Sequence, residues 1–261
     1  MNILEELAAL ARERVKADRT RIPEAEMHDL AVSAGKGGSE RFTAALAKPG
    51  ISFICEVKRA SPSKGLIAPD FPYTEIAREY EAAGADCISC LTEPHYFLGS
   101  DDIFREVRQV TSLPMIRKDF TVSLYQLDQA RVMGADAALL IVSLMDREML
   151  EACLRRCDEL GIAALTETHD EAEIHTAVDA GARIIGVNNR NLKDFSVDFG
   201  NTARLRDLIP ADRICVAESG VRGPEDVARL RVIGADAVLI GETLMRAADK
   251  TACLKALKEE A

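Results

Sequence analysis

A chain of 261 residues with 48% hydrophobic and 29% charged residues has ample material for a core, which argues against intrinsic disorder. Its 33 basic and 43 acidic residues give a formal net charge of −10, which argues against a broad nucleic-acid-binding surface. No apolar stretch approaches the roughly 20 residues of a membrane span, and the N-terminal pattern is not that of a signal peptide. We therefore expect a cytoplasmic, monomeric protein that binds neither membranes nor nucleic acid, and its seven scattered cysteines fit a reducing compartment.

Residues 1–48 are predicted to form a helical extension packed on the domain that follows. Two groups of apolar residues recur at helical spacing, namely Leu4, Leu7, Ala11 and Val15, then Phe42, Leu46 and Ala47. Such an extension either packs as a cover over the domain's floor or forms a lid over its mouth, and the pattern allows both.

Residues 49–261 repeat one unit of strand and helix. Four similar segments, AAGADCISCL, VMGADAALLIV, DAGARIIGVNN and VIGADAVLIGE, each begin with a glycine that suits the left-handed end of a helix and continue into a strand. Four further apolar runs lie between them, at 51–58, 113–118, 162–167 and 213–218. The result is eight strands about 25 residues apart, separated by amphipathic segments such as YTEIAREYEAA and PEDVARLRVI.

Continuous apolar strands alternating with amphipathic helices predict an all-parallel sheet, and eight such units close it into a barrel. The fold class is therefore α/β, a single (β/α)8 barrel of the TIM type with an N-terminal helical extension. An open doubly wound sheet is the alternative, but no glycine-rich fingerprint opens a helix after the first strand.

Polar residues end five of the predicted strands, where a buried strand would normally avoid them. They are Glu56, Lys58, Lys118, Glu167, Asn188, Glu218 and Ser219. In a barrel of this kind the carboxyl ends of the strands form the active face, so these side chains are expected to converge. Glu56 and Lys58 are two residues apart, which places them side by side on one face as an ion pair.

A phosphate site is predicted beyond the last two strands. Ser219-Gly220 and Gly241-Glu242 follow strands seven and eight, where loops and a short helix commonly offer backbone N–H groups to a phosphate. We expect a small phosphorylated ligand, with the basic residues around Lys58 and Lys64 helping to attract it.

No metal site is expected. Cys87 and Cys90 would point to opposite faces of a strand, and Cys153 and Cys157 share a helix face without further ligands. The histidines show no ligand spacing and are expected at surface or loop positions; they are His28, His95, His169 and His175.

Seven motifs in order along the chain resemble the indole-3-glycerol phosphate synthase family. They are CEVKRASPSKG (55–65), LTEPHYFLGS (91–100), IRKDF (116–120), LTETHDE (165–171), GVNNRNL (186–192), AESG (217–220) and LIGETLM (239–245). The first and third are specific to the family. Thr166 and Thr168 stand where many relatives carry valine.

The resemblance implies a cofactor-free lyase of tryptophan biosynthesis that converts 1-(2-carboxyphenylamino)-1-deoxyribulose 5-phosphate to indole-3-glycerol phosphate, with loss of carbon dioxide and water. It implies that Lys118 is the general acid for ring closure, oriented by Glu56, and that Glu167 is the base. Lys58 would contact the substrate and is a candidate donor for water loss.

The resemblance also implies the binding residues. Asn188 and Glu218 would hold the developing hydroxyl and cationic intermediates, and Arg190 would meet the anthranilate carboxylate. The remaining binding set is the ring walls Phe97 and Phe120, and Ser61, Ser219, Gly220, Gly241 and Glu242 toward the phosphate.

Two other functions could use the same residues. A lysine at a barrel strand end can form a Schiff base with a sugar-phosphate carbonyl, as in an aldolase or isomerase. A barrel that only binds a phosphorylated ligand is the third possibility, although binding alone does not need so many ionisable groups at one mouth.

Overall fold

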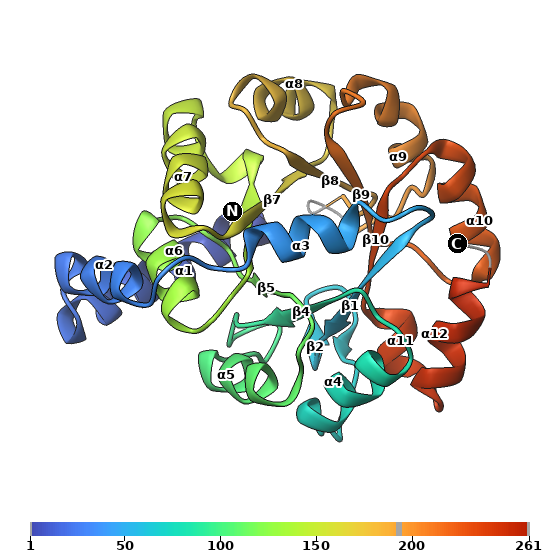
Figure 1. Cartoon of the computed structure of the whole chain (residues 1–261), viewed down its shortest axis with the longest axis horizontal. Helices are drawn as coiled ribbons and strands as arrows, with labels where there is room; N and C mark the ends of the chain where they lie inside the picture. Colours follow the sequence, from blue (N-terminus) through green and yellow to red (C-terminus); the bar gives the residue numbers. More distant parts are fainter. Residues whose placement is uncertain (1, 192–194, 260–261) are drawn as a thin grey trace.

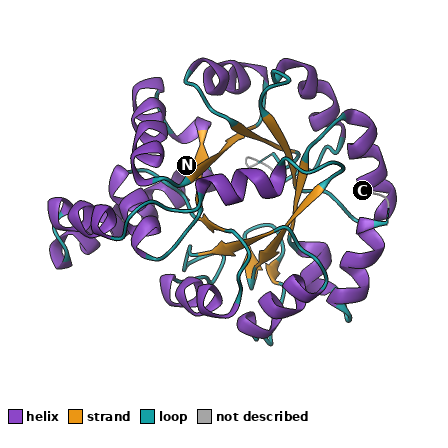
Figure 2. Ribbon diagram, viewed as in Figure 1, coloured by secondary structure: helices purple, strands orange, loops and turns teal. Residues whose placement is uncertain are grey.

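The computed structural model describes residues 2–191 and 195–259, and its centre is a closed barrel of parallel strands (Figures 1 and 2). Around the barrel the strands follow the order β1-β10-β9-β8-β7-β6-β5-β4. Their bounds are β1 Ser52–Val57, β4 Cys87–Leu91, β5 Met115–Lys118, β6 Ala137–Ile141, β7 Ala163–Thr168, β8 Ile184–Asn188, β9 Ile214–Glu218 and β10 Ala237–Ile240. Each coincides with a predicted strand segment, with β7 running one residue beyond its segment to Thr168, so the predicted barrel is confirmed.

Helices surround the barrel and connect its strands (Figure 1). After the N-terminal region they are α4 Tyr73–Ala82, α5 Asp101–Val110, α6 Leu124–Val132, α7 Arg147–Leu160, α8 Glu171–Asp179, α9 Gly200–Leu205, α10 Pro224–Ile233, α11 Glu242–Arg246 and α12 Lys250–Lys258, with short 3₁₀ turns η1 Val142–Leu144 and η2 Arg206–Leu208. The predicted glycines have left-handed backbone at the junctions, with φ from 81° to 90° at Gly84, Gly134, Gly181 and Gly234. Glycine suits this conformation because it lacks a Cβ.

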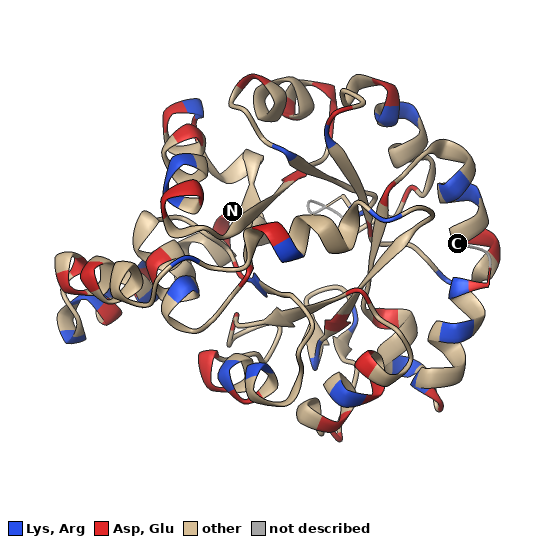
Figure 3. Cartoon of the chain, viewed as in Figure 1, with Lys and Arg blue, Asp and Glu red and all other residues tan. Residues whose placement is uncertain are grey.

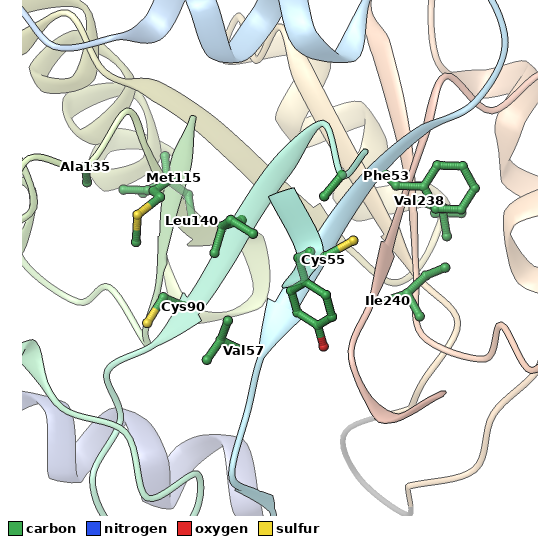
Figure 4. Close-up of a cluster of buried hydrophobic side chains, with 14 of the residues drawn as sticks. Phe53, Cys55, Val57, Cys90, Met115, Ala135, Leu140, Val238 and Ile240 are labelled. Atoms are coloured by element: carbon green, nitrogen blue, oxygen red, sulfur yellow. The ribbon is translucent and has the colours of Figure 1, made fainter. Parts of the chain in front are cut away.

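The barrel strands are buried on both faces. Along each strand, residues point alternately toward the surrounding helices and toward the barrel interior. On β1, Phe53, Cys55 and Val57 pack outward with the helices, as Figure 4 shows for this cluster. Ile54 packs into the barrel interior, and Glu56 shares its direction. The same alternation puts Cys87 in the interior cluster and Cys90 in the outer one, so the two thiols do face apart as predicted.

The N-terminal region forms three helices, α1 Ile3–Arg21, α2 Glu24–Ser33 and α3 Ser39–Leu46. Helix α3 crosses the barrel in Figure 1, and its start is bonded to the segment that enters β7, through Ser39 N to Gly161 O at 2.9 Å. Its Phe42 and Leu46 are fully buried with the interior residues, whereas Ala47 is exposed. Helix α3 therefore closes the floor of the barrel.

Helix α1 lies at the other end of the barrel, beside the loops that leave the strands. Glu6 accepts a hydrogen bond from Tyr96 Oη at 2.6 Å, in the segment after β4. Arg14 pairs with Asp119, directly after β5. One helix of the extension thus covers the floor of the barrel, and another borders its mouth.

Two features lie outside the sequence prediction. A small antiparallel pair, β2 Ala60–Ser61 and β3 Gly65–Leu66, folds over within the long loop after β1. In the part of the chain that the structure describes, no helix is long and apolar enough to cross a membrane. Leu192, the last residue of the fifth motif, lies outside the described residues.

Candidate active site

A cavity of about 640 Å³ opens at the carboxyl ends of the strands. A ligand pocket in this size range is typical of small-molecule sites. Its lining includes every predicted site residue, namely Glu56, Lys58, Ser61, Phe97, Lys118, Phe120, Glu167, Asn188, Arg190, Glu218, Ser219, Gly220, Gly241 and Glu242. The convergence predicted from the strand ends is thus found in the structure.

Glu56 and Lys58 form an ion pair on the first strand and the residue just beyond it. Lys58 Nζ contacts Glu56 Oε2, and both side chains are largely buried. The period of two along the strand brings the pair together, as predicted. Among the described residues, no ion pair within 4.0 Å joins Glu56 to Lys118, although the negative charge of Glu56 contributes to raising the pKa of Lys118.

Lys118 stands between two other carboxylates. Its Nζ lies 3.1 Å from Glu167 Oε2 and 3.2 Å from Glu218 Oε2. Burial alone would favour the neutral amine, but the charges of Glu218, Glu167 and the more distant Glu56 outweigh it and raise the pKa of Lys118 above its ordinary value. The resting site therefore holds Lys118 in its charged, protonated form.

The two carboxylates beside Lys118 differ in character. Burial raises the pKa of Glu218, Lys118 offsets part of this effect, and the charge of Glu167 adds to it, giving a value of about 7. Burial also opposes ionisation of Glu167, but Lys118, His169 and Asn188 together hold its pKa well below the ordinary range. When the surroundings of two neighbouring carboxyl groups give them different pKa values, the two groups commonly have different roles in catalysis.

Buried polar groups fix the position of these carboxylates. Asn188 Nδ2 donates to Glu167 Oε1 at 3.0 Å, and Asn188 Oδ1 accepts from the Arg190 amide at 3.0 Å. Glu218 Oε1 is buried and has no hydrogen-bond partner among residues 2–191 and 195–259. A buried carboxylate oxygen without a donor is a natural contact point for a polar ligand atom.

His169 belongs to this cluster, although the sequence prediction left it at a surface or loop position. It follows β7 directly, and its Nε2 lies 3.3 Å from Glu167 Oε1. Its spacing of two from Glu167 is the same signal that linked Glu56 to Lys58, so the contact could have been predicted. None of the four histidines is among the residues that line the cavity; His175 is exposed on α8, His95 is exposed after β4, and His28 contacts Asp128 from α2.

The backbone beyond β9 has an unusual conformation. Ser219 has φ of 68° and Gly220 has φ of 92°, so two consecutive residues are left-handed and one of them is not glycine. Asn189 Nδ2 donates to Ser219 O at 3.0 Å, which supports this turn from β8. Non-glycine residues held in this region commonly mark ligand-binding or catalytic sites.

Position 241, directly after β10, has no room for a side chain and therefore requires glycine. A Cβ at this position would lie 2.2 Å from Glu56 Oε2 and 2.8 Å from Lys58 Nζ. The glycine therefore lets the Glu56–Lys58 pair lie directly against the start of α11.

Two aromatic rings lie at the part of the mouth that follows β4 and β5, and β5 lies across the barrel from β9. Phe97 and Phe120 lie with their ring centroids 6.0 Å apart and inclined at 43°. Ile3, Leu4 and Leu7 of α1 complete the wall, a role that their spacing alone did not reveal.

Cations border the mouth despite the chain's net negative charge. Lys64, Arg190 and Arg246 each lie within 4.0 Å of a Glu242 carboxylate oxygen. Arg222 also lines the cavity, and the sequence prediction did not name it or Arg246. In the described part of the chain, no group of three or more His, Cys, Asp or Glu side chains has the arrangement of a metal site.

These elements suit acid–base chemistry on an anionic ligand with an aromatic part. The cavity offers a charged amine between carboxylates of different basicity, a left-handed turn beside the strand ends, and an aromatic wall across from it. Such a set can protonate an oxygen at one point and remove a proton at another.

Comparison with known proteins gives a consistent family. The family model described as indole-3-glycerol phosphate synthase matches residues 4–257. The chain is similar to the indole-3-glycerol phosphate synthase of Lachnoclostridium phytofermentans, with 45% identity over 98% of each chain. It is 47% identical to that of Ruminiclostridium cellulolyticum, over 99% of this chain and 100% of the relative.

More distant solved structures share the barrel. Thiamine phosphate pyrophosphorylase from Pyrococcus furiosus has a TM-score of 0.61 and 16% identity, covering 80% of this chain and 94% of that one. KGPDC from Streptococcus mutans has a TM-score of 0.62 and 12% identity, covering 80% and 96%. At these identities the likeness concerns the fold alone.

Proposed function

The chain belongs to the indole-3-glycerol phosphate synthase family, and we propose that it converts 1-(2-carboxyphenylamino)-1-deoxyribulose 5-phosphate to indole-3-glycerol phosphate, carbon dioxide and water. This makes it a carbon–carbon lyase of tryptophan biosynthesis. The observation that carries the assignment to this site is Lys118, held charged between Glu167 and Glu218 at the centre of the cavity.

The substrate has two anionic groups and an aromatic ring, and the cavity provides for each. We assign the phosphate to the turn at Ser219-Gly220 and the start of α11 at Gly241-Glu242, with Ser61 nearby in the loop after β1. The aromatic ring would lie against Phe97 and Phe120. Arg190 is assigned to the anthranilate carboxylate.

Ring closure requires the aromatic carbon that bears the carboxylate to attack the ketone carbon. We assign Lys118 as the acid that protonates the ketone oxygen as the carbon–carbon bond forms. Carbon dioxide then leaves, and the electron pair of the broken bond restores the aromatic ring. Glu218 and Asn188 would stabilise the hydroxyl-bearing intermediates.

Dehydration needs a second proton donor and a base. Lys58, paired with Glu56, is assigned to protonate the departing hydroxyl. Glu167 would remove a proton from the carbon between the ring nitrogen and the former ketone carbon. Lys118 and Lys58 each donate one proton to the substrate, and Glu167 removes one. The substrate therefore gains one proton overall, as it must when its carboxylate leaves as carbon dioxide.

The contact between Lys118 and Glu167 suits this sequence. While Lys118 is charged it weakens Glu167 as a base, because the positive charge stabilises the carboxylate. Once Lys118 has given its proton to the ketone oxygen, that stabilisation ends and Glu167 becomes more basic. The first step would thus prepare the base for the last.

We further propose that residues 1–48 act as part of the barrel domain that follows, since α3 closes its floor and α1 supplies part of the cavity wall. A monomer is proposed, because every predicted site residue meets in a single cavity of one chain and the site needs no residue from a second copy. A cytoplasmic location is supported by the seven cysteines, all of which are free thiols.

A turnover assay tests the proposed function. The chain contains no tryptophan and only four tyrosines, so an indole product gives fluorescence that the protein does not mask when excited beyond tyrosine absorption. We expect this fluorescence to rise on adding the carboxyphenylamino sugar phosphate. Its absence with folded protein and fresh substrate would refute the assignment.

A Schiff-base aldolase or isomerase is the competing chemistry. It requires a neutral amine as nucleophile, whereas two carboxylates hold Lys118 in its charged form. Borohydride treatment of the protein with substrate should therefore leave Lys118 and Lys58 unmodified. Peptide mass analysis that finds substrate attached to either lysine would support the aldolase instead.

A further inference from the structure

His169 lies between a carboxylate of the site and a carboxylate near the surface. Its Nε2 is 3.3 Å from Glu167 Oε1, and its Nδ1 is 3.0 Å from Glu173 Oε2 on α8. The His169 backbone amide also donates to Glu173 Oε2 at 2.8 Å. Asn201 of α9 donates to the His169 carbonyl at 3.1 Å, so the residue is held from three elements.

The imidazole ring contacts one carboxylate oxygen of Glu167, and the other oxygen faces Lys118 in the cavity. Oε1 receives the Asn188 amide at 3.0 Å and faces the imidazole, while Oε2 faces Lys118 at 3.1 Å. Nε2 of His169 is buried, and the carboxylate oxygen that faces it is Glu167 Oε1, at 3.3 Å. His169 is not among the residues that line the cavity.

We propose that His169 is a positioning residue for Glu167, and that Glu173 keeps its imidazole oriented and positively charged. The inference deepens the proposed function, on which it rests. A cation behind Oε1 would stop the carboxylate from rotating when Lys118 loses its charge, so that Oε2 stays aimed at the carbon to be deprotonated. Placement errors of about 1 Å can cost roughly a hundredfold in rate.

The charges that face the ring support this role. Among the described residues, Glu167 from β7 and Glu173 from α8 are the ionisable groups in contact with it. Burial disfavours the imidazolium, but the hydrogen bonding and charge of Glu167 and Glu173 outweigh burial and raise the pKa of His169 to about 10. The ring is therefore charged at neutral pH, as the proposal requires.

Kinetics of paired variants provide the first test. His169→Ala should lower kcat by roughly tenfold to a hundredfold with little change in KM, because Glu167 loses its orientation and the substrate contacts remain. His169→Gln keeps a side-chain donor and should retain more of kcat than His169→Ala. The matched control is His175→Ala on α8, whose ring makes a more distant contact of 3.6 Å with the exposed Glu171.

The proposal fails if His169→Ala keeps a kcat within about twofold of His175→Ala. It also fails if the two variants are slow only in proportion to a loss of folded protein, measured by circular dichroism and thermal unfolding, since loss of packing would then explain the effect. If the wild-type chain itself gives no turnover, the proposed function is refuted.

Nuclear magnetic resonance of the imidazole nitrogens tests the contact without any turnover. The His169 signals, assigned by their loss in His169→Gln, should stay those of an imidazolium through pH 8. In Glu167→Gln the ring should lose its proton at lower pH, because a stabilising negative charge has been removed. An identical titration in wild type and Glu167→Gln would overturn the proposal even where the enzyme is active.

Discussion

Lys118 is the residue on which the proposed chemistry depends most. Lys118→Arg keeps the positive charge, but a guanidinium is a far poorer acid and its planar fork differs in reach. We expect kcat to fall by at least about a hundredfold, which is within the usual contribution of general acid catalysis, while KM changes much less. Steady-state kinetics in the fluorescence assay measure both constants.

The control for that substitution is Lys64→Arg, a change at the exposed rim of the cavity. It should leave kcat near wild type. If Lys118→Arg also keeps most of its activity, Lys118 serves only to bind anions, and Lys58 becomes the leading candidate for the acid.

Glu218 should control the response to pH near neutrality. Its pKa is raised to about 7, so the carboxyl is mostly neutral below that pH and increasingly ionised above it. The ionised form is the one that pairs with Lys118 and would stabilise cationic intermediates, so activity should rise as pH increases through about 7. A profile of kcat/KM against pH should show this rise, and the remaining activity of Glu218→Gln should lack it. An unchanged rise in that variant would assign it to another group.

The turn at Ser219 tests where the phosphate binds. Ser219→Asp places a negative charge in the turn and should raise KM about tenfold or more, because like charges brought together cost several kcal/mol. Ser219→Asn is the matched control, similar in size, uncharged and at ease in the left-handed conformation. Equal KM values for the two variants would place the phosphate elsewhere. Gly241→Val would not isolate the phosphate contact, because its Cβ would displace the Glu56–Lys58 pair.

At the scale of elements, an ion pair joins helix α1 to the segment that follows Lys118. Arg14 donates to both oxygens of Asp119, at 2.6 and 3.0 Å, and Asp119 directly follows Lys118. Arg14→Ala should lower the free energy of unfolding by about 1.5–3 kcal/mol, which is typical of hydrogen bonds to charged groups. It should also raise KM, since Leu4 and Leu7 of α1 line the cavity. Denaturant unfolding and kinetics measure the two effects.

Arg12→Ala is the control for this prediction, because Arg12 is exposed on the same helix. It should change neither quantity appreciably. If Arg14→Ala behaves like Arg12→Ala, the pair does not hold α1 against the mouth.

The strand and helix elements were predictable because most of them carry a periodic pattern, and four helix-to-strand junctions carry a glycine in the left-handed conformation. The polar ends of the strands were predictable for the same reason, since a parallel barrel brings all of them to one face. The hairpin of β2 and β3 was not, because its two-residue strands are too short to show a period. The place of α1 was not either, since an apolar stripe says that a helix is buried but not against which surface.

The contact between His169 and Glu167 was missed in the sequence analysis for a different reason. Its spacing from Glu167 was visible, but histidine after a strand is common, and only the return of α8 brings Glu173 to its far side. Which carboxylates the two lysines contact also depends on distances across the barrel: Lys58 pairs with Glu56, and Lys118 pairs with Glu167 and Glu218. Long-range geometry of this kind is not contained in local sequence patterns.

At the scale of the whole molecule, charge is unevenly arranged. Acidic and basic residues are spread along the outer helices (Figure 3), and the chain carries a net charge of −10. Lys58, Lys64, Arg190, Arg222 and Arg246 nevertheless gather around the cavity. A local positive mouth of this kind attracts small anions to an acidic protein without attracting polyanions.

The central claim is that one chain closes the ring and removes the carboxyl group, and the stoichiometry of the products tests it most directly. Substrate labelled with carbon-13 in its carboxyl group would be incubated with the enzyme while labelled carbon dioxide and indole fluorescence are followed together. We predict one labelled carbon dioxide for each indole product, and release of neither by Lys118→Arg beyond its residual rate. Consumption of substrate without labelled carbon dioxide, as an aldolase or isomerase would give, would contradict the account.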